Sequence, residues 1–404
     1  MADFHQNGVI STLHNISNRS VDDLEKELRE FSKQRPIELI LPCLFSEIEG
    51  QALGKIIKVL SEIDYLNHII IGLDKANEKQ YKKAKEFFSE LNQPHSILWN
   101  DGPRLSSLDK QLNTLNLSPN QSGKGKNVWY CMGYTLARDQ AKSIALHDCD
   151  ILTYSREFIA RLVYPVSNPL FDYEFCKGYY PRVGDNKLNG RVSRLLVTPL
   201  LKTFTKVLGH RDLIEFIDVF RYPLAGDCSF KSRLLKEIRI PSDWGLEIGL
   251  LSEMQRSQAN KKICQVDIAK MYDHKHQPLS EEDSEKGLSR MSIDISKTLI
   301  RKLAAQGDTF THNTLRTIKA TYYRTALDLL ETYHNDAKIN GLNHNINDEE
   351  IAIELFANNI ITAGKQFLDN PNENPLIPNW NRVQDACPSI KEDLLKAVSD
   401  DNSI

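Results

Sequence analysis

The stretch SIALHDCDILTY, residues 143–154, runs from an apolar segment into two aspartates that are separated by one residue. Burying one unpaired carboxylate is costly, and two carboxylates close together repel each other. In a continuing strand, residues i and i+2 project to the same side, so Asp148 and Asp150 would converge. A divalent cation such as Mg²⁺, which binds one or two carboxylates together with phosphate oxygens, would remove this repulsion. The alternative is that both aspartates only solvate a turn or cap the next helix.

Similar apolar runs precede this stretch and alternate with segments of helical spacing. The runs are short and contain isoleucine and leucine: IELILPCL (37–44), HIIIGLD (68–74) and SILWN (96–100). Such alternation predicts an α/β fold with a mainly parallel sheet flanked by helices on both faces. In sheets of this kind, ligands bind beyond the carboxyl ends of the strands. Asp148 and Asp150 follow such an end, which favours the metal interpretation.

Three segments are expected along the chain. Residues 1–35 are polar and contain an amphipathic helix with Ser20 as its N-cap. Residues 36–280 hold the alternating strands and helices and form the predicted main domain. Residues 281–404 have an almost wholly helical pattern, which predicts a C-terminal helical extension.

The bulk composition excludes several classes of protein. The chain has 404 residues and a formal net charge of −3, so binding of nucleic acid through bulk charge is not expected. Its 7 cysteines are scattered and form no CxxC pair, which argues against a disulfide framework and a cysteine-rich zinc site. No secretory signal is evident, and no apolar run approaches the roughly 20 residues that span a bilayer. We therefore expect a cytoplasmic protein that does not enter the membrane.

Two basic residues stand where helices are predicted to begin. Lys124 lies in SGKGKNVW (122–129), but a P-loop would need glycine and a hydroxyl residue where Ser118 and Gly125 stand. What remains is a lysine near a helix N-terminus, able to grip a phosphate, or else a solvated lysine in a flexible loop. Arg191 lies in NGRVSRLL (189–196), where a cation opposes the helix dipole unless an anionic ligand shares the site. A surface salt bridge is the alternative for Arg191.

A glutamate and a histidine pair complete the candidate residues. Glu247 lies in the apolar helix start GLEIGLL (245–251), where it needs a partner, although the helix dipole alone also favours a carboxylate there. His274 and His276 follow the last predicted strand in YDHKHQ. A lone histidine is usually structural, but a pair at a strand end is a better candidate for a metal ligand.

Taken in order, these motifs resemble a known family over about residues 36 to 305. LPCLFSE, SGKGKNVW, LHDCDI, GRVSRLLVTPLL, YPLAGDCSF, GLEIGLL and YDHKHQPL are similar to the glucosyl-3-phosphoglycerate synthases, retaining glycosyltransferases with the GT-A fold and of the family 81 type. The resemblance implies transfer of glucose from a nucleotide-glucose to 3-phosphoglycerate, and UDP-glucose is the donor that it favours. The product, glucosyl-3-phosphoglycerate, is a precursor of the compatible solute glucosylglycerate. Related transferases that use GDP-glucose, GDP-mannose or free glycerate remain alternatives.

The resemblance also implies roles for individual residues. The donor would be bound by a turn under the nucleotide base, by carboxylates and by a lysine: Pro42, Cys43, Leu44, Glu47, Asp74, Lys124, Asp148, Ala225, Gly226 and Glu247. The acceptor would be held by Gly190, Arg191, Val192, Ser193 and His276. Asp150 and His274 would bind the divalent metal, Mg²⁺ or Mn²⁺. Glu247, Arg191 and Leu224 would line the reacting centre, with no enzymic nucleophile.

The sequence departs from the family pattern at several points. The acidic run of the first segment is reduced to Glu47, and Asp74-Lys75-Ala76 stands where the family often has Asp-Ser-Gly. The helical extension is longer than is usual in the family. We predict that it forms a homodimer interface, and the alternative is that it only packs on the core.

Three other protein classes fit the sequence less well. An inverting polysaccharide transferase would carry Gln-x-x-Arg-Trp, which Gln255-Arg256-Ser257 does not match. A sugar-phosphate nucleotidyltransferase needs a glycine-rich basic loop after the first strand, and PCLFSEIEG does not supply one. A non-catalytic binding protein would have no need of the aspartate pair, His274 and Arg191 together.

Overall fold

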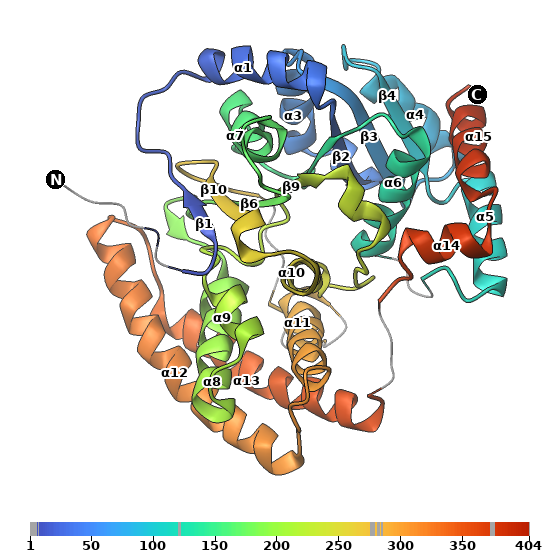
Figure 1. The fold of residues 1–404 in the computed structure, drawn as a ribbon. Helices are drawn as coiled ribbons and strands as arrows, with labels where there is room; N and C mark the ends of the chain where they lie inside the picture. Colours follow the sequence, from blue (N-terminus) through green and yellow to red (C-terminus); the bar gives the residue numbers. More distant parts are fainter. Residues whose placement is uncertain are drawn as a thin grey trace.

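An eight-stranded, mostly parallel sheet lies at the centre of the molecule (Figure 1). The structure is a computed structural model that describes residues 6, 8–119, 123–274, 279–280, 283, 286–371 and 376–403. The order across the sheet is β1-β10-β6-β9-β5-β2-β3-β4. The strands are β1 Ser11–Leu13, β2 Ile37–Leu44, β3 Leu66–Asp74, β4 His95–Trp99, β5 Ser143–Leu146, β6 Phe175–Tyr179, β9 Cys228–Lys231 and β10 Ile263–Asp267. The predicted α/β fold is confirmed.

Strand β9 is the exception to the parallel order, and the sequence pattern did not predict it. It pairs antiparallel with both β5 and β6, so that Leu146 and Lys177 both lie opposite Cys228. The first residue of β9 therefore lies opposite the carboxyl end of β5 and the middle of β6. The loop that precedes β9 is brought to the edge of the sheet where ligands bind in such folds.

Alternate strand residues enter two apolar cores, one on each face of the sheet. Ile40 and Ile70 pack into one core, and Leu39 and Ile71 pack into the other. The second core is closed by α1 Val21–Gln34, α2 Phe45–Ile48, α3 Gln51–Ser61, α4 Glu78–Phe88 and α7 Arg156–Ser167. Isoleucine and leucine on both faces explain why the strands read as continuous apolar runs rather than as alternating ones.

The helices on the opposite face come from residues 103–138 and from residues 192–257. They are α5 Pro103–Thr114, α6 Lys124–Arg138, the π-helical segment η1 Val192–Val197, α8 Thr198–Leu208, α9 Asp212–Asp218, the short η2 Ser232–Lys236 and α10 Leu246–Ser257. Segment η1 runs directly into α8, whose second residue is Pro199. A further short helix, η3 Asn260–Lys262, leads into β10.

The C-terminal extension divides into two groups of helices (Figure 1). In the first group, α11 Gly287–Ala304, α12 His312–Ile339 and α13 Ile346–Asp369 pack on one another and against η1. In the second group, α14 Trp380–Ala386 and α15 Ile390–Asn402 return to α5, α6 and β4, where Trp380 stacks on Trp129 with ring centroids 4.3 Å apart. The domain boundary at residue 280 stays a prediction. Within the described ranges, no helix is long and apolar enough to cross a membrane.

Candidate active site

The candidate residues gather at the edge of the sheet where the parallel strands end. Strands β2 and β3 end side by side, with Leu44 opposite Asp74. Strand β5 ends at Leu146, two residues before Asp148. The two aspartates therefore lie just beyond the strand end, as the sequence predicted, so the alternation of side chains within a strand does not set their directions.

Lys124 links two of the predicted donor-binding carboxylates. Its Nζ atom lies 2.6 Å from Oδ1 of Asp148 and 3.1 Å from Oε1 of Glu247. Burial would raise the pKa of Asp148, but the Lys124 ammonium outweighs it and holds that pKa below its ordinary value. Helix α6 supplies the lysine and α10 the glutamate, each from its first turn. The three side chains form one charged cluster at the mouth of the site.

Asp150 and His274 face each other across the same edge. The His274 Nδ1 and Asp150 Oδ2 atoms are 3.7 Å apart, and the neighbouring Ile151 pairs with His274 in an isolated bridge. Burial, reinforced by the charge of Asp148, raises the pKa of Asp150 to about 7.

The carboxylates and the histidine at this edge fit a divalent cation whose coordination is completed by atoms of a bound substrate. Asp148, Asp150 and Glu247 together carry three formal negative charges against the single positive charge of Lys124. Among the described residues, no group of three or more His, Cys, Asp or Glu side chains is arranged to hold a metal by itself. Mg²⁺ and Mn²⁺ sites commonly complete such a partial set with water and phosphate oxygens. His276 lies outside the described residues.

Gly226 permits a close approach between the loop before β9 and the charged cluster. A Cβ atom on this residue would lie 2.6 Å from Oδ2 of Asp148 and 3.0 Å from Nζ of Lys124. The glycines that flank Lys124 have a different cause, because a Cβ on Gly125 would lie 2.0 Å from the carbonyl oxygen of Pro241. The Gly-Lys-Gly motif therefore allows helix α6 to pack on a neighbouring segment and present Lys124.

The loop that contains Leu224, Ala225 and Gly226 rests on buried polar groups that the sequence analysis missed. The Nζ atom of Lys177, on β6, donates a 2.6 Å hydrogen bond to the Ala225 carbonyl oxygen. The Tyr180 hydroxyl donates to Oδ2 of Asp227 at 2.7 Å, and burial raises the pKa of Asp227 to about 7. A lysine within the apolar strand FCKGY and an aspartate just before β9 were the available signals.

The residues predicted to bind the nucleotide base occupy the end of β2 and the elements next to it. Pro42, Cys43 and Leu44 are the last three residues of the strand, so the expected turn is wrong, and the chain turns only at helix α2. Glu47 lies on that helix. Asp74, at the end of β3, accepts a 2.6 Å hydrogen bond from Nδ2 of Asn100, and burial raises its pKa to about 6.

The predicted acceptor segment begins at a glycine that must adopt a left-handed conformation. Gly190 has φ +78°, and a Cβ there would lie 3.4 Å from the Tyr222 hydroxyl. Arg191 follows with its side chain 38% exposed, whereas Val192 and Ser193 are buried in η1. The Ser193 hydroxyl is buried and has no hydrogen-bond partner in the described structure. Irregular helical turns of this π type are frequent at functional sites.

Tyr222 connects the acceptor segment to the loop before β9. Its hydroxyl accepts a 3.1 Å hydrogen bond from Nη1 of Arg182, and its carbonyl accepts one from the amide of Ala225. Arg182 is 8% exposed and lies 5.4 Å from the centre of the Tyr272 ring. The structure therefore places a buried guanidinium beside the acceptor segment, which sequence analysis did not identify. His147, by contrast, is structural: it is fully buried and hydrogen-bonded to Tyr154 at 2.9 Å.

Curated relatives match the chain over its whole length. A glucosyl-3-phosphoglycerate synthase of Persephonella marina is 45% identical over 403 residues, which is 100% of both chains. The chain belongs to the glucosyl-3-phosphoglycerate synthase family. A second member, from Methanococcoides burtonii, is 39% identical over 400 residues, or 98% of this chain and 97% of the relative. The predicted glycosyltransferase identity is thereby confirmed. No protein-family model matches the sequence.

Solved structures of the Mycobacterium tuberculosis synthase share the fold. One, in complex with Mn²⁺, uridine-diphosphate-glucose and phosphoglyceric acid, is 21% identical with a TM-score of 0.52, and covers 72% of this chain and 87% of that chain. Another, in complex with Mg²⁺ and uridine-diphosphate, has the same identity of 21% and TM-score of 0.52, and covers 73% and 86% of the two chains. The likeness confirms the predicted glycosyltransferase fold, and the bound ions agree with the predicted divalent metal.

Proposed function

We propose that this chain transfers glucose from UDP-glucose to the hydroxyl of 3-phosphoglycerate, with retention of configuration and with Mg²⁺ or Mn²⁺ as cofactor. Membership of the synthase family supports the reaction class. The observation that carries the proposal is the charged cluster at the sheet edge, where Lys124 contacts both Asp148 and Glu247, beside Asp150 and His274. The ligands of the solved relative, a uridine nucleotide sugar and phosphoglyceric acid, supply the choice of donor and acceptor.

The donor would lie along the ends of β2, β3 and β5. In this proposal Lys124 grips the nucleotide's phosphate, Asp148 contacts the ribose, and Glu247 binds glucose hydroxyls from the start of α10. Asp150 and His274 hold the divalent ion, which would neutralise negative charge on the diphosphate as it departs. Gly226 lets the loop before β9 pack closely on Asp148, because any side chain there would meet the carboxylate.

The acceptor would lie against the start of η1. A 3-phosphoglycerate molecule carries a carboxylate and a phosphate, and a guanidinium with backbone N–H groups at a helix start suits both anions. Arg191 and the turn at Gly190 therefore receive the acceptor, with the Ser193 hydroxyl as a further donor. Electrostatics favours an anionic acceptor over a neutral one at this end of the site.

The chemistry requires no nucleophile from the protein. The acceptor's hydroxyl oxygen attacks C1 of glucose on the face from which the diphosphate leaves, and the C1–O bond to the diphosphate breaks. The departing phosphate oxygen takes the hydroxyl proton, so the products are glucosyl-3-phosphoglycerate and UDP. The task of the protein is to orient both substrates and to stabilise the separating charge.

A substrate panel tests the proposal. UDP-glucose, GDP-glucose, GDP-mannose and ADP-glucose are each combined with 3-phosphoglycerate or glycerate in the presence of Mg²⁺, and release of nucleoside diphosphate is measured. We expect the highest kcat/KM for UDP-glucose with 3-phosphoglycerate, and proton NMR of its product should show the α-anomer. Failure of every donor to react with 3-phosphoglycerate would contradict the proposal. Preference for GDP-glucose would overturn only the choice of nucleotide.

A further inference from the structure

We infer that Glu349, on helix α13 of the C-terminal extension, is a positioning residue for the acceptor: it holds Arg191 by the Nε atom and leaves the outer end of the guanidinium free for the acceptor's anionic group. The inference rests on the proposed function and goes beyond it, because it gives the extension a part in the acceptor site. Glu349 lies 158 positions along the chain from Arg191.

Glu349 is the centre of a buried ionic network. Nε of Arg191 donates to its Oε1 at 3.2 Å, while Arg194 donates to Oε2 at 2.8 Å and to Oε1 at 3.2 Å. His344 Nε2 lies 3.5 Å from Oε2. The glutamate is only 4% exposed, and although burial would raise its pKa, the charge of Arg194 outweighs that effect and lowers it. It is therefore an ionised carboxylate that is largely removed from water.

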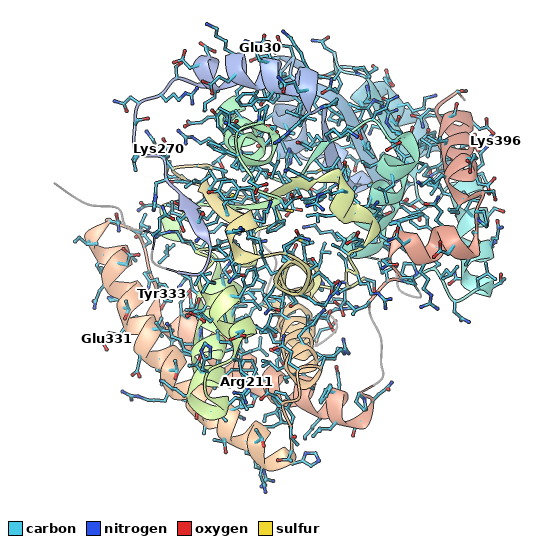
Figure 2. All side chains as sticks on the ribbon, viewed as in Figure 1. Glu30, Arg211, Lys270, Glu331, Tyr333 and Lys396 are labelled. Carbon is cyan, nitrogen blue, oxygen red and sulfur yellow. The ribbon has the colours of Figure 1, made fainter. Side chains whose placement is uncertain are left out.

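The two arginines use their guanidinium groups differently. Arg194 is 9% exposed in its side chain, and its nitrogens are directed at Glu349 and at the carbonyls of Leu188 and Asn189. It also lies over the ring of Tyr333, 5.1 Å from the ring centre, and Figure 2 marks this tyrosine on α12. Arg194 is thus fully engaged within the protein and serves to hold the segment in place.

Arg191 keeps two nitrogens available. Its side chain is 38% exposed, and within the described residues its Nη1 and Nη2 atoms have no hydrogen-bond partner. Because a guanidinium is rigid and planar, a bond at Nε fixes the direction in which the two outer nitrogens point. Those two nitrogens form the fork that binds a carboxylate or phosphate in a bidentate manner. Two arginines against one carboxylate also leave a net positive charge for an anion.

The extension contacts the acceptor segment at a second place. The small hairpin of β7 Val183–Gly184 and β8 Lys187–Leu188 immediately precedes Gly190. The loop between α12 and α13 docks on this hairpin, where the Asn343 amide donates a 2.7 Å hydrogen bond to the carbonyl of Asn186. Both the turn that leads into the acceptor segment and its arginine are thereby held by the extension.

The test compares Glu349→Gln with Glu350→Gln, which changes the exposed next residue of the same helix. KM for 3-phosphoglycerate, KM for the sugar nucleotide and kcat are measured on both variants and on the wild type. We expect Glu349→Gln to raise KM for 3-phosphoglycerate about tenfold, because a glutamine side chain offers only one hydrogen-bonding oxygen to the two arginines. KM for the donor should stay within about twofold, and Glu350→Gln should match the wild type. If only the loss of negative charge mattered, the acceptor KM would fall instead, because the anionic acceptor would be attracted more strongly.

A double-mutant comparison separates positioning from a general structural effect. If Glu349 acts through Arg191, then adding Glu349→Gln to Arg191→Ala should change the acceptor KM by less than about twofold. An unchanged or lowered acceptor KM in the single variant, or an equal increase in both backgrounds, would overturn the inference. If Glu349→Gln does not fold, Glu349→Asp, which keeps the charge but withdraws the carboxylate by one methylene, is measured with the same expected increase. A wild type that does not use 3-phosphoglycerate refutes the proposed function, whereas an active wild type with unaltered variants refutes only this inference.

Discussion

Replacing Gly226 by alanine should separate activity from stability. The new Cβ would lie 2.6 Å from Oδ2 of Asp148, whereas ordinary contact begins at 3.4 Å, so the carboxylate must move by the difference, about 0.8 Å. Such a shift also disturbs the ion pair of Asp148 with Lys124, whose Nζ would lie 3.0 Å from the added carbon. A misplacement of about 1 Å typically costs on the order of 100-fold in rate, or about 2.7 kcal/mol of transition-state stabilisation. We therefore expect kcat/KM for the sugar nucleotide to fall about 100-fold.

The measurement is a steady-state assay of nucleoside diphosphate release, with urea unfolding recorded on the same preparations. Gly54→Ala is the matched control, because Gly54 lies within helix α3 and a Cβ there meets nothing within 4 Å. This control should keep wild-type activity and gain about 0.5–1 kcal/mol of stability, as expected for glycine to alanine inside a helix. If Gly226→Ala retained kcat/KM within threefold of the wild type, the close packing of the site around Asp148 would be refuted.

Three further outcomes are expected. Chelation with EDTA should abolish activity, and adding Mg²⁺ or Mn²⁺ should restore it. Asp150→Ala should remain inactive at every metal concentration, while its circular dichroism spectrum stays that of the wild type. Near-normal rates in this variant would contradict the role of Asp150 as a metal ligand. Asp227→Asn should flatten the pH dependence of stability. Burial raises the pKa of Asp227 to about 7 from 3.8, so the folded protein binds a proton that the unfolded chain releases, and the stability that this proton gives is lost as pH rises through 7. In urea unfolding, the variant should therefore gain stability relative to the wild type between pH 4 and 8, and parallel pH curves would contradict the assignment. Sedimentation velocity should give twice the chain mass of 46.2 kDa for the predicted homodimer, and a monomer at all concentrations would refute it.

Much of the fold could be predicted because its signals are local. The runs at 37–44, 68–74 and 96–100 became β2, β3 and β4, since apolar residues must fill cores on both faces of a parallel sheet. Ser20 caps α1 as predicted, with its side chain accepting from the amide of Asp23. The position of Asp148 and Asp150 beyond a strand end also followed from the sequence. The pattern did not predict β9, because a four-residue strand carries no indication of its direction or its partners.

The candidate site divides in the same way. Sequence motifs identified Lys124, Asp148 and Glu247, and the fold brings these three into contact from three separate elements. They did not identify Lys177 or Asp227, whose importance depends on the carbonyl and hydroxyl groups that surround them in the folded chain. In the sequence alone, a polar residue within an apolar segment looks the same whether its side chain supports a functional loop or only has its own hydrogen bonds satisfied.

The sequence by itself determined which residue types are available to bind a sugar nucleotide and an anionic acceptor, because charged and glycine-rich motifs next to apolar strands are local patterns. Only the tertiary structure decided that β9 runs antiparallel and carries its loop to the donor site, and that α13 brings Glu349 to Arg191. The physical reason is that hydrogen bonds and ion pairs between distant segments depend on how whole helices and strands pack, and no local pattern of residues encodes that arrangement.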